Sequence, residues 1–346
     1  MANSCWCCVA SSNGGSTRDA PYIVSMRFPL SALALSCVVL AGCSSSSGSS
    51  TAASTDSQAV SSSAPAPAAT DPAATDAPTS TTIDPTIARP FDVFVPTAYD
   101  GTTAVPLLVL LHGYGASGAI QEAYFQVQPI AEARGFLYVH ADGTKNAVDS
   151  QFWNATDACC GGPDATVDDS AYITAIIESV QKDYKVDPKR IYLMGHSNGG
   201  FMSFRMACDH ADKIAAIASL AGATFSDVSK CAPSEPVNIL AIHGTGDQTI
   251  KYAGDQIQGR SYPSAQTTTA TWATYNGCSA TSTTSPTKVD LEPGIEGAES
   301  TIAAFDGCPA GVGVELWSIE GGQHIPSVSP AFIGAIIDFL LAHPKA

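Results

Sequence analysis

Residues 85–346 predict an α/β fold with a mostly parallel sheet and helices on both faces. Short apolar runs alternate along the chain with amphipathic segments, which is the order of strands and helices in such folds. Several of the runs are apolar throughout, as expected for strands that are covered on both faces. One run leads into a serine between two glycines, and an amphipathic segment follows at once. These observations together indicate one large domain.

The elements follow in order from the apolar pattern. The predicted strands are short and mostly apolar, and they lie at residues 91–95, 106–111, 136–140, 191–194, 214–221, 237–243 and 314–319. The predicted helices are amphipathic and lie at residues 121–134, 167–184, 200–206, 266–275 and 330–342. Asp168 or Asp169 is expected to cap the second of these helices, since a carboxylate accepts hydrogen bonds from the free amides of a first turn.

The start of the chain has the composition of an export signal. Residues 28–42 are mostly apolar, follow a single positive charge and end in Leu-Ala-Gly before Cys43, which predicts a lipoprotein signal with Cys43 as the acylated residue. The apolar run is too short to cross a bilayer comfortably. We interpret residues 1–43 as an upstream extension followed by the signal peptide, with Met26 as the expected start of translation. The lipid on Cys43 would tie the mature protein to a membrane.

The segment between this signal and the domain is of low complexity. Residues 44–84 consist almost wholly of Ser, Ala, Thr, Pro and Asp, so they cannot bury enough apolar surface to offset the entropy of ordering. We expect a disordered linker there. The whole chain has a formal net charge of −16, spread along its length. That charge suits an exported protein and argues against nucleic acid as a partner.

A nucleophile elbow is predicted at residues 195–199, which read Gly-His-Ser-Asn-Gly. A serine between a buried strand and a helix must lie on a sharp, strained turn, so glycine is needed on both sides of it. Such a turn exposes the hydroxyl above the sheet, at the positive end of the helix dipole. The motif alone is common in unrelated chains, but here the strand and the helix both flank it. We therefore predict Ser197 as a nucleophile.

The acid and the base of a serine triad follow the nucleophile in this fold, in that order. Asp247 comes directly after a buried strand, which places it at the carboxyl edge of the sheet. His324 lies in a glycine-rich loop between the last strand and the last helix, where an imidazole can reach the serine. His196 is fixed inside the elbow, and His243 precedes the acid. We predict Asp247 to orient His324, and His324 to take the proton of Ser197.

Two backbone amides are predicted to form an oxyanion hole. Asn198 follows the nucleophile and supplies one amide, and Tyr114 supplies the other from the loop after the central strand. Tyr114 and Trp153 are also the aromatic residues expected to line the cleft, as a flat wall for an aryl acid or an extended polyester. The alternative that Trp153 only fills the core stays open at this point.

Six cysteines remain in the predicted domain, which is consistent with three disulfides in an exported protein. Metal binding is the competing interpretation, but no cysteine pair or histidine spacing supports it, and we expect neither a metal nor a cofactor. Cys278 and Cys308 are the expected local pair. The pairing of the other four stays open, and these are Cys159, Cys160, Cys208 and Cys231.

Two other functions compete with hydrolysis. Residues 113–118 read Gly-Tyr-Gly-Ala-Ser-Gly between a strand and a helix, with Asp142 after the next strand, as in an NAD-binding oxidoreductase. That interpretation leaves Ser197, Asp247 and His324 unexplained. The other competitor is a catalytically inactive hydrolase fold that serves as a surface binding lipoprotein, and an intact triad argues against it.

The domain resembles the polyhydroxybutyrate-depolymerase-like and feruloyl-esterase-like α/β-hydrolases, including exported esterase lipoproteins. The matching blocks are residues 110–115 (LLHGYG), 153–160 (WNATDACC), 167–169 (VDD), 195–200 (GHSNGG), 243–247 (HGTGD) and 321–324 (GGQH). The resemblance implies a secreted serine esterase that forms an acyl-enzyme with short hydroxyacyl, polyester, feruloyl or acetyl esters. It also implies Ser197 as nucleophile, His324 as base and Asp247 as the residue that orients it.

The sequence departs from this family beside the predicted base. The family often has a third glycine before the catalytic histidine and a Trp-Pro pair soon after it, whereas this chain has Gln323 and Ile325-Pro326. Gln323 and Ile325 are therefore expected to line the substrate site. With Ile325 the cleft is expected to be more open on the side of His324 and the activity broad, with polymers among the candidate substrates.

Overall fold

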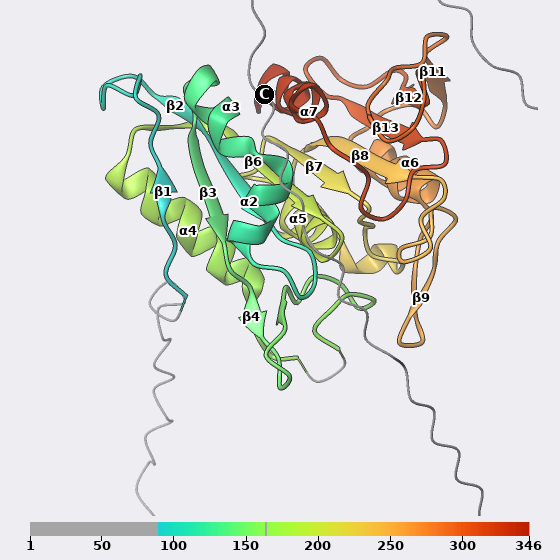
Figure 1. Cartoon of the computed structure of the whole chain (residues 1–346), viewed down its shortest axis with the longest axis horizontal. Coiled ribbons are helices and arrows are strands. Elements are labelled where there is room, and N and C mark those ends of the chain that lie inside the picture. The colour runs from blue at the N-terminus through green and yellow to red at the C-terminus, as the bar shows by residue number, and fades with distance from the viewer. Residues whose placement is uncertain (1–88, 163–164, 346) are drawn as a thin grey trace, which may run out of the picture. The chain divides into compact units, whose positions relative to one another are not determined.

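The computed structural model describes residues 89–162 and 165–345. These residues form a sheet with helices packed on both of its faces (Figure 1). The predicted signal peptide, the lipidation site Cys43 and the linker at residues 44–84 lie outside the described residues. The boundaries predicted for these segments therefore stay predictions.

The sheet has nine strands within the described residues, in the order β1-β3-β2-β6-β7-β8-β13-β12-β11. The strands are β1 (Val93–Phe94), β2 (Val105–Leu111), β3 (Leu137–Ala141), β6 (Val186–His196), β7 (Ala216–Leu220), β8 (Asn238–Gly244), β11 (Ser282–Thr284), β12 (Ser300–Phe305) and β13 (Val314–Ile319). The six central strands pair in parallel, and β1, β12 and β11 pair antiparallel at the edges. The predicted α/β-hydrolase fold is confirmed.

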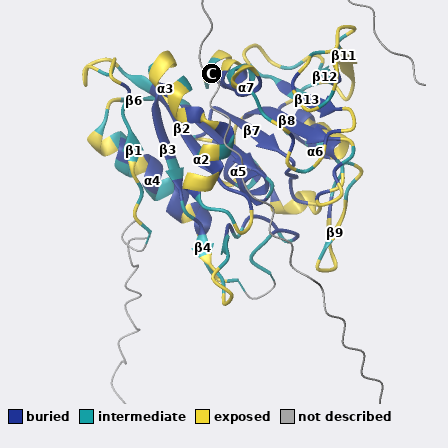
Figure 2. Ribbon diagram, in the orientation of Figure 1, coloured by how far each residue is buried: buried dark blue, intermediate teal, exposed yellow. Residues whose placement is uncertain are grey.

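The buried residues of the central strands are mostly apolar because they face helices on both sides. The helices are α2 (Gly118–Phe125), α3 (Val127–Arg134), α4 (Asp169–Asp183), α5 (Asn198–Asp209), α6 (Ala265–Tyr275) and α7 (Pro330–Ala342). Along β2, Leu107 and Val109 belong to the core shared with α4, α5 and α6. Leu108 and Leu110 belong to the core shared with α2, α3 and α7. Figure 2 shows this buried sheet under an exposed outer surface.

The helix predicted at residues 121–134 is two helices, which corrects the prediction. Gln126 has a left-handed backbone, with φ of 53°, and separates α2 from α3. Pro129 cannot donate a backbone hydrogen bond to the preceding turn, so a continuous helix would be interrupted there. The carboxylate of Glu122 accepts hydrogen bonds from the amides of Val127 and Gln128 and so caps α3.

Several peripheral strands have no counterpart in the prediction. β11 and β12 extend the sheet beyond β13, and two hairpins project from it. The hairpins are β4–β5 (Thr144–Lys145 with Gln151–Phe152) and β9–β10 (Asp255–Ile257 with Arg260–Tyr262). β11 is fully exposed and polar, so no apolar alternation marks it in the sequence.

Three disulfides join the six cysteines of the described residues. Cys278 pairs with Cys308, as expected from their neighbourhood in the sequence. Cys208, in α5, pairs with Cys231, and the adjacent Cys159 and Cys160 pair with each other. Within the described part of the chain, no helix has the length and apolar character needed to cross a membrane.

Candidate active site

Ser197 lies at the turn between β6 and α5, in a backbone conformation that is rare for any residue other than glycine. Its φ is 54° and its ψ is −118°. Such strain persists only where the surrounding structure enforces it, and it is frequent at functional sites. A Cβ added to Gly195 would lie 2.2 Å from the carbonyl oxygen of Gly199, and one added to Gly199 would lie 2.1 Å from the carbonyl oxygen of Leu111. The two glycines therefore permit the strained turn.

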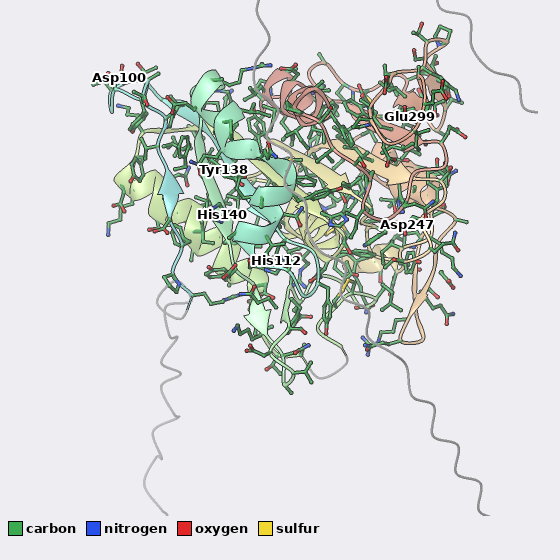
Figure 3. The ribbon with its side chains drawn as sticks, in the orientation of Figure 1. Asp100, His112, Tyr138, His140, Asp247 and Glu299 are labelled. Carbon is green, nitrogen blue, oxygen red and sulfur yellow. A yellow bond between two sulfur atoms is a disulfide. The ribbon has the colours of Figure 1, made fainter. Side chains whose placement is uncertain are left out.

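The side chain of His324 contacts Ser197 across 127 residues of sequence. His324 Nε2 lies 2.9 Å from Ser197 Oγ, and its Nδ1 lies 2.8 Å from Asp247 Oδ2. All three residues follow strands of the parallel part of the sheet, β6, β8 and β13, so they meet at its carboxyl edge. The three residues predicted as a triad are thus brought together in hydrogen-bonding contact. Figure 3 labels Asp247 in the turn after β8.

The carboxylate of Asp247 is fully buried and held on both oxygens. Oδ1 accepts hydrogen bonds from the amides of Thr249 and Ile250, at 2.8 and 2.9 Å. Oδ2 faces His324, while the Nε2 of His243 lies farther away, at 3.4 Å, and donates to the carbonyl of Ile250 at 2.7 Å. Burial alone raises the pKa of Asp247, but the contacts with His243 and His324 outweigh it and hold this pKa well below its usual range. Asp247 is therefore ionised and can stabilise a protonated His324.

The turns that carry the acid and the base pack directly against each other. A Cβ on Gly244 would lie 2.2 Å from the carbonyl oxygen of Gly322, so only a glycine allows this approach. Gly246 donates its amide hydrogen to that carbonyl at 2.9 Å. Gly321 donates to the hydroxyl of Thr245 at 2.8 Å. These contacts fix the loop of His324 relative to Asp247.

Two free amides lie beside Ser197. In the loop after β2, the amides of Gly113, Gly115 and Ala116 all donate hydrogen bonds, to Gln121 Oε1, Gln151 O and Gly113 O respectively. Within the described residues, no acceptor takes the amide hydrogen of Tyr114 or of Asn198. A Cβ on Gly113 would lie 3.5 Å from the Cβ of Ser197, so this loop runs close to the nucleophile. The arrangement suits an oxyanion hole.

The side chain of Asn198 holds the segment that contains Trp153. Asn198 Oδ1 accepts from the amide of Trp153 at 2.7 Å, and Nδ2 donates to the carbonyl of the same residue at 2.9 Å. Nδ2 also lies 3.5 Å from the sulfur of Cys159. The side chain of Asn198, the residue after the nucleophile, is thus committed to these contacts, while its backbone amide has no acceptor within the described residues. No pattern in the sequence indicates this second use of Asn198.

Trp153 does not line the cleft, and the expectation that it does is wrong. Its exposed fraction is 0%, and its indole nitrogen donates to the carbonyl of His112 at 3.0 Å. Its ring lies against the rings of His112 and Tyr172. His112, which follows β2, and Tyr172, in α4, pack against the fully buried indole, and the local sequence could not reveal these contacts. Trp153 supports the oxyanion loop from inside the core.

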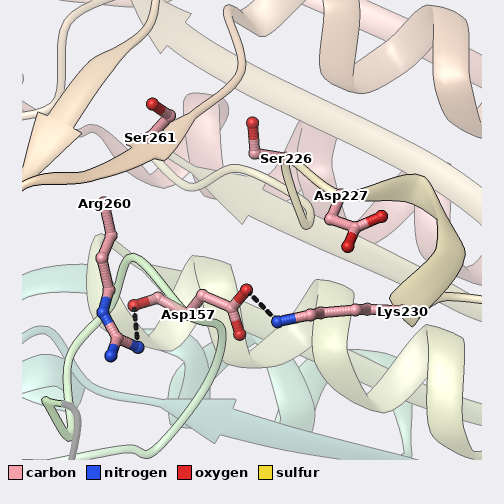
Figure 4. Close-up of a pocket in the computed structure, with 6 residues that line it drawn as sticks. All are labelled: Asp157, Ser226, Asp227, Lys230, Arg260 and Ser261. Atoms are coloured by element: carbon pink, nitrogen blue, oxygen red, sulfur yellow. Dashed lines mark hydrogen bonds and ion pairs between the residues drawn. The ribbon is translucent and has the colours of Figure 1, made fainter.

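The other residues predicted to bind substrate are exposed. Tyr114 is 50% exposed and Ile325 is 66% exposed, and Gln323 donates to the carbonyl of Gly321. A pocket of 240 Å³ next to Tyr114 is lined by Tyr114, Asp157, Ala158, Cys160, Gly162, Ile257, Gln258 and Arg260. A second pocket of 470 Å³ shares two of these residues and is lined by Asp157, Ser226, Asp227, Lys230, Arg260 and Ser261 (Figure 4). The two pockets adjoin at Asp157 and Arg260, and only the second is lined wholly by polar or charged residues.

The glycine-rich loop at residues 113–118 is committed to other contacts. The carboxylate of Asp142 accepts a hydrogen bond from the amide of Gly118 at 2.7 Å, and Ser117 caps α2 through its hydroxyl. A carboxylate at this helix start repels a phosphate group. The oxidoreductase alternative therefore has no support in this loop. In the described residues no three His, Cys, Asp or Glu side chains form a group that could hold a metal ion.

Comparison with known proteins gives the family. Residues 98–285 match the family model described as phospholipase/carboxylesterase. The chain belongs to this family. This carboxylesterase-family chain is also 31% identical to feruloyl esterase B of Piromyces equi over 237 residues, which are 66% of the chain and 41% of that protein. It is 27% identical to feruloyl esterase D of Neurospora crassa over 254 residues, which are 69% of the chain and 75% of that protein.

A solved structure supports the same fold. The acetyl xylan esterase from Aspergillus awamori superposes with a TM-score of 0.52 at 14% identity, covering 73% of this carboxylesterase-family chain and 93% of that one. At this identity the likeness concerns the fold alone. The resemblance to feruloyl-esterase-like α/β-hydrolases is confirmed, and the resemblance to polyhydroxybutyrate depolymerases stays a prediction.

Replacing Trp153 by alanine should lower stability and activity together. Loss of a fully buried indole costs about 3 to 5 kcal/mol of unfolding free energy. Because the residue lies behind the oxyanion loop, kcat should fall on small and large esters alike. Urea unfolding and ester hydrolysis measure both effects, with Val148→Ala, an exposed change in the nearby hairpin, as the control. A rise in KM confined to bulky esters would show instead that Trp153 lines the cleft.

The stability of the domain should fall as the pH drops from about 6.5 to about 4. Burial lowers the pKa of His196 from 6.5 to about 4, so in this interval the unfolded chain binds a proton that the folded chain excludes. The contribution of neutral His196 to the unfolding free energy is complete above pH 6.5 and can reach about 3 kcal/mol. In His196→Gln the unfolding free energy should depend less steeply on pH over this interval. Parallel curves for the two proteins would contradict the assignment.

Proposed function

We propose that this chain is a serine carboxylic-ester hydrolase that works through an acyl-enzyme. The observation that carries the proposal is the continuous contact from Ser197 Oγ through His324 to the buried carboxylate of Asp247. Family membership supports the same reaction class. A binding lipoprotein with an inactive hydrolase fold would have no need for this geometry, which includes a strained serine.

In the proposed mechanism, His324 takes the proton of Ser197 as the hydroxyl attacks the ester carbonyl. Asp247 keeps the hydrogen on Nδ1 of His324, so that Nε2 is free to accept, and it stabilises the imidazolium that forms. The amides of Tyr114 and Asn198 donate to the oxyanion of the tetrahedral intermediate; each such donor typically contributes about 3 to 4 kcal/mol. His324 then protonates the leaving alcohol. In the second half of the reaction, water attacks the acyl-enzyme while His324 takes its proton. His324 then returns this proton to Ser197 as the carboxylic acid leaves.

The proposed substrates are feruloyl, acetyl or short hydroxyacyl esters, including polymeric ones. The names of two relatives, both feruloyl esterases, support the first of these. The polar pocket of Figure 4 supports a substrate with a hydroxyl-bearing part, because all six residues that line it are polar or charged. The exposure of Ile325 supports a cleft that is open on the side of the base. An open cleft fits broad rather than narrow selectivity.

Export and lipidation at Cys43 complete the proposal. They rest on the Leu-Ala-Gly-Cys pattern at residues 40–43 and on the three disulfides, because disulfides persist in oxidising compartments. Mass spectrometry of the mature protein should find Cys43 as the diacylated or triacylated first residue. A mature amino terminus elsewhere would contradict the lipid anchor.

Ser197→Ala should abolish ester hydrolysis and leave the fold intact, because the elbow turn depends on Gly195 and Gly199 and not on the serine hydroxyl. Hydrolysis of p-nitrophenyl acetate and the urea unfolding curve test the two halves of this statement. Residual activity above about a hundredth of the wild-type rate would rule out Ser197 as the nucleophile. Phenylmethylsulfonyl fluoride should add one sulfonyl group to the wild type and none to Ser197→Ala.

Arg260→Met should raise KM for large hydroxylated substrates more than for small ones. Arg260 lines both pockets and Ser197 lines neither, so we expect p-nitrophenyl acetate, a small substrate, not to contact Arg260. Kinetics on p-nitrophenyl acetate, methyl ferulate, acetylated xylan and a hydroxybutyrate polymer film would rank the substrate classes. Lys182→Met, which removes an exposed charge from α4, is the matched control. Equal changes in KM on all four substrates would show that the polar pocket is not a substrate site.

A further inference from the structure

His196 precedes the nucleophile and takes no part in the contacts of Ser197, His324 and Asp247 described above. It is the last residue of β6 and only 6% exposed. Its Nε2 lies 2.8 Å from the main-chain carbonyl oxygen of His324. A carbonyl oxygen can only accept, so Nε2 carries the hydrogen and donates it. The residue next to the nucleophile therefore holds the backbone of the residue that activates it.

This contact is part of a set that fixes the loop between β13 and α7. On the side of α2, the hydroxyl of Tyr124 donates to the carbonyl of Pro326 at 2.5 Å. On the side of the acid, Gly246 donates to the carbonyl of Gly322 at 2.9 Å. The bond from His196 lies between these two, at His324 itself. Asp247 orients the imidazole of His324, and His196 fixes the backbone from which that imidazole extends.

The surroundings of His196 keep its ring uncharged. The rings of Tyr124, Phe125 and His324 lie around it at centroid distances of 5.8, 6.4 and 5.0 Å. Burial lowers the pKa of His196 to about 4, and beyond this shell Asp247 raises this pKa and His243 lowers it, both less than burial does. A neutral donor holds the carbonyl without placing a second positive charge beside His324 when that residue becomes protonated.

We propose that His196 is a positioning residue that sets the reach of His324 toward Ser197 by holding its main-chain carbonyl. The inference rests on the proposed esterase function and adds a residue to it. Because His196 and Ser197 are neighbours in the chain, the nucleophile and the base share one support. A shift of the elbow would move the base with it.

The test compares three variants at residue 196. His196→Gln keeps an N–H donor at about the distance of Nε2, His196→Asn has the same amide one methylene closer to the backbone, and His196→Leu has no donor. On p-nitrophenyl acetate, kcat should fall about tenfold in the Leu and Asn variants, while KM stays within about twofold of wild type. The Gln variant should recover most of kcat, since only it restores the bond to the carbonyl of His324.

Unfolding curves distinguish the positioning role of His196 from a loss of folding, and Ser197→Ala distinguishes it from a failure of the esterase function. If the Leu variant fails to fold, the Gln and Asn variants decide, because both carry an amide and only the former reaches the carbonyl. Equal kcat in the Gln and Asn variants, or a wild-type kcat in the Leu variant, would overturn the positioning role. Activity that survives in Ser197→Ala would overturn the proposed function instead.

Discussion

The geometry of the site depends on backbones that approach each other more closely than any side chain allows. At the elbow, Gly199 lies against the carbonyl of Leu111, and at the acid and base turns, Gly244 lies against the carbonyl of Gly322. Each contact joins the ends of two strands that are neighbours in the sheet, β2 with β6 and β8 with β13. The sheet therefore brings the loops together, and the glycines set the remaining distance between them.

The first of these contacts also determines where the oxyanion amides lie. With α5 pressed against the end of β2, the loop of Tyr114 runs beside Ser197. On the core side of this loop, the side chain of Asn198 bonds the backbone of Trp153, and the indole of Trp153 bonds the carbonyl of His112. A buried backbone group left without a partner costs about 1 to 3 kcal/mol. These hydrogen bonds therefore favour this one arrangement of the loops over others that would leave the groups unpaired.

The sequence predicted the central part of the molecule better than its edges. The six central strands, β3, β2, β6, β7, β8 and β13, were recognised because burial on both faces makes most of their residues apolar. The elbow was recognised because its glycines have a steric cause. β11 has no such signal, since it pairs only through its backbone in a polar environment. The break at Gln126 depends on a left-handed backbone, which a glutamine side chain does not indicate. Only Pro129, inside the predicted helix, indicated an interruption.

The position of a side chain relative to a cleft was the least predictable property. Trp153 and Tyr114 are both aromatic residues in loops at the carboxyl edge, yet one is fully buried and the other half exposed. The difference arises from Tyr172 and His112, which cover the indole from elements that are distant in the sequence. For the same reason, the sequence singled out His196 only as a fixed part of the elbow and not as a contact of His324.

The separation of 127 residues between the nucleophile and the base has a consequence for folding. Ser197 can adopt its turn once β6, α5 and β2 are packed, but His324 arrives only when β13 has joined the sheet and α7 has covered it. Contacts between such distant segments form late and slowly. Ester hydrolysis would therefore begin only after the last third of the domain has docked, and the appearance of activity would time the completion of folding.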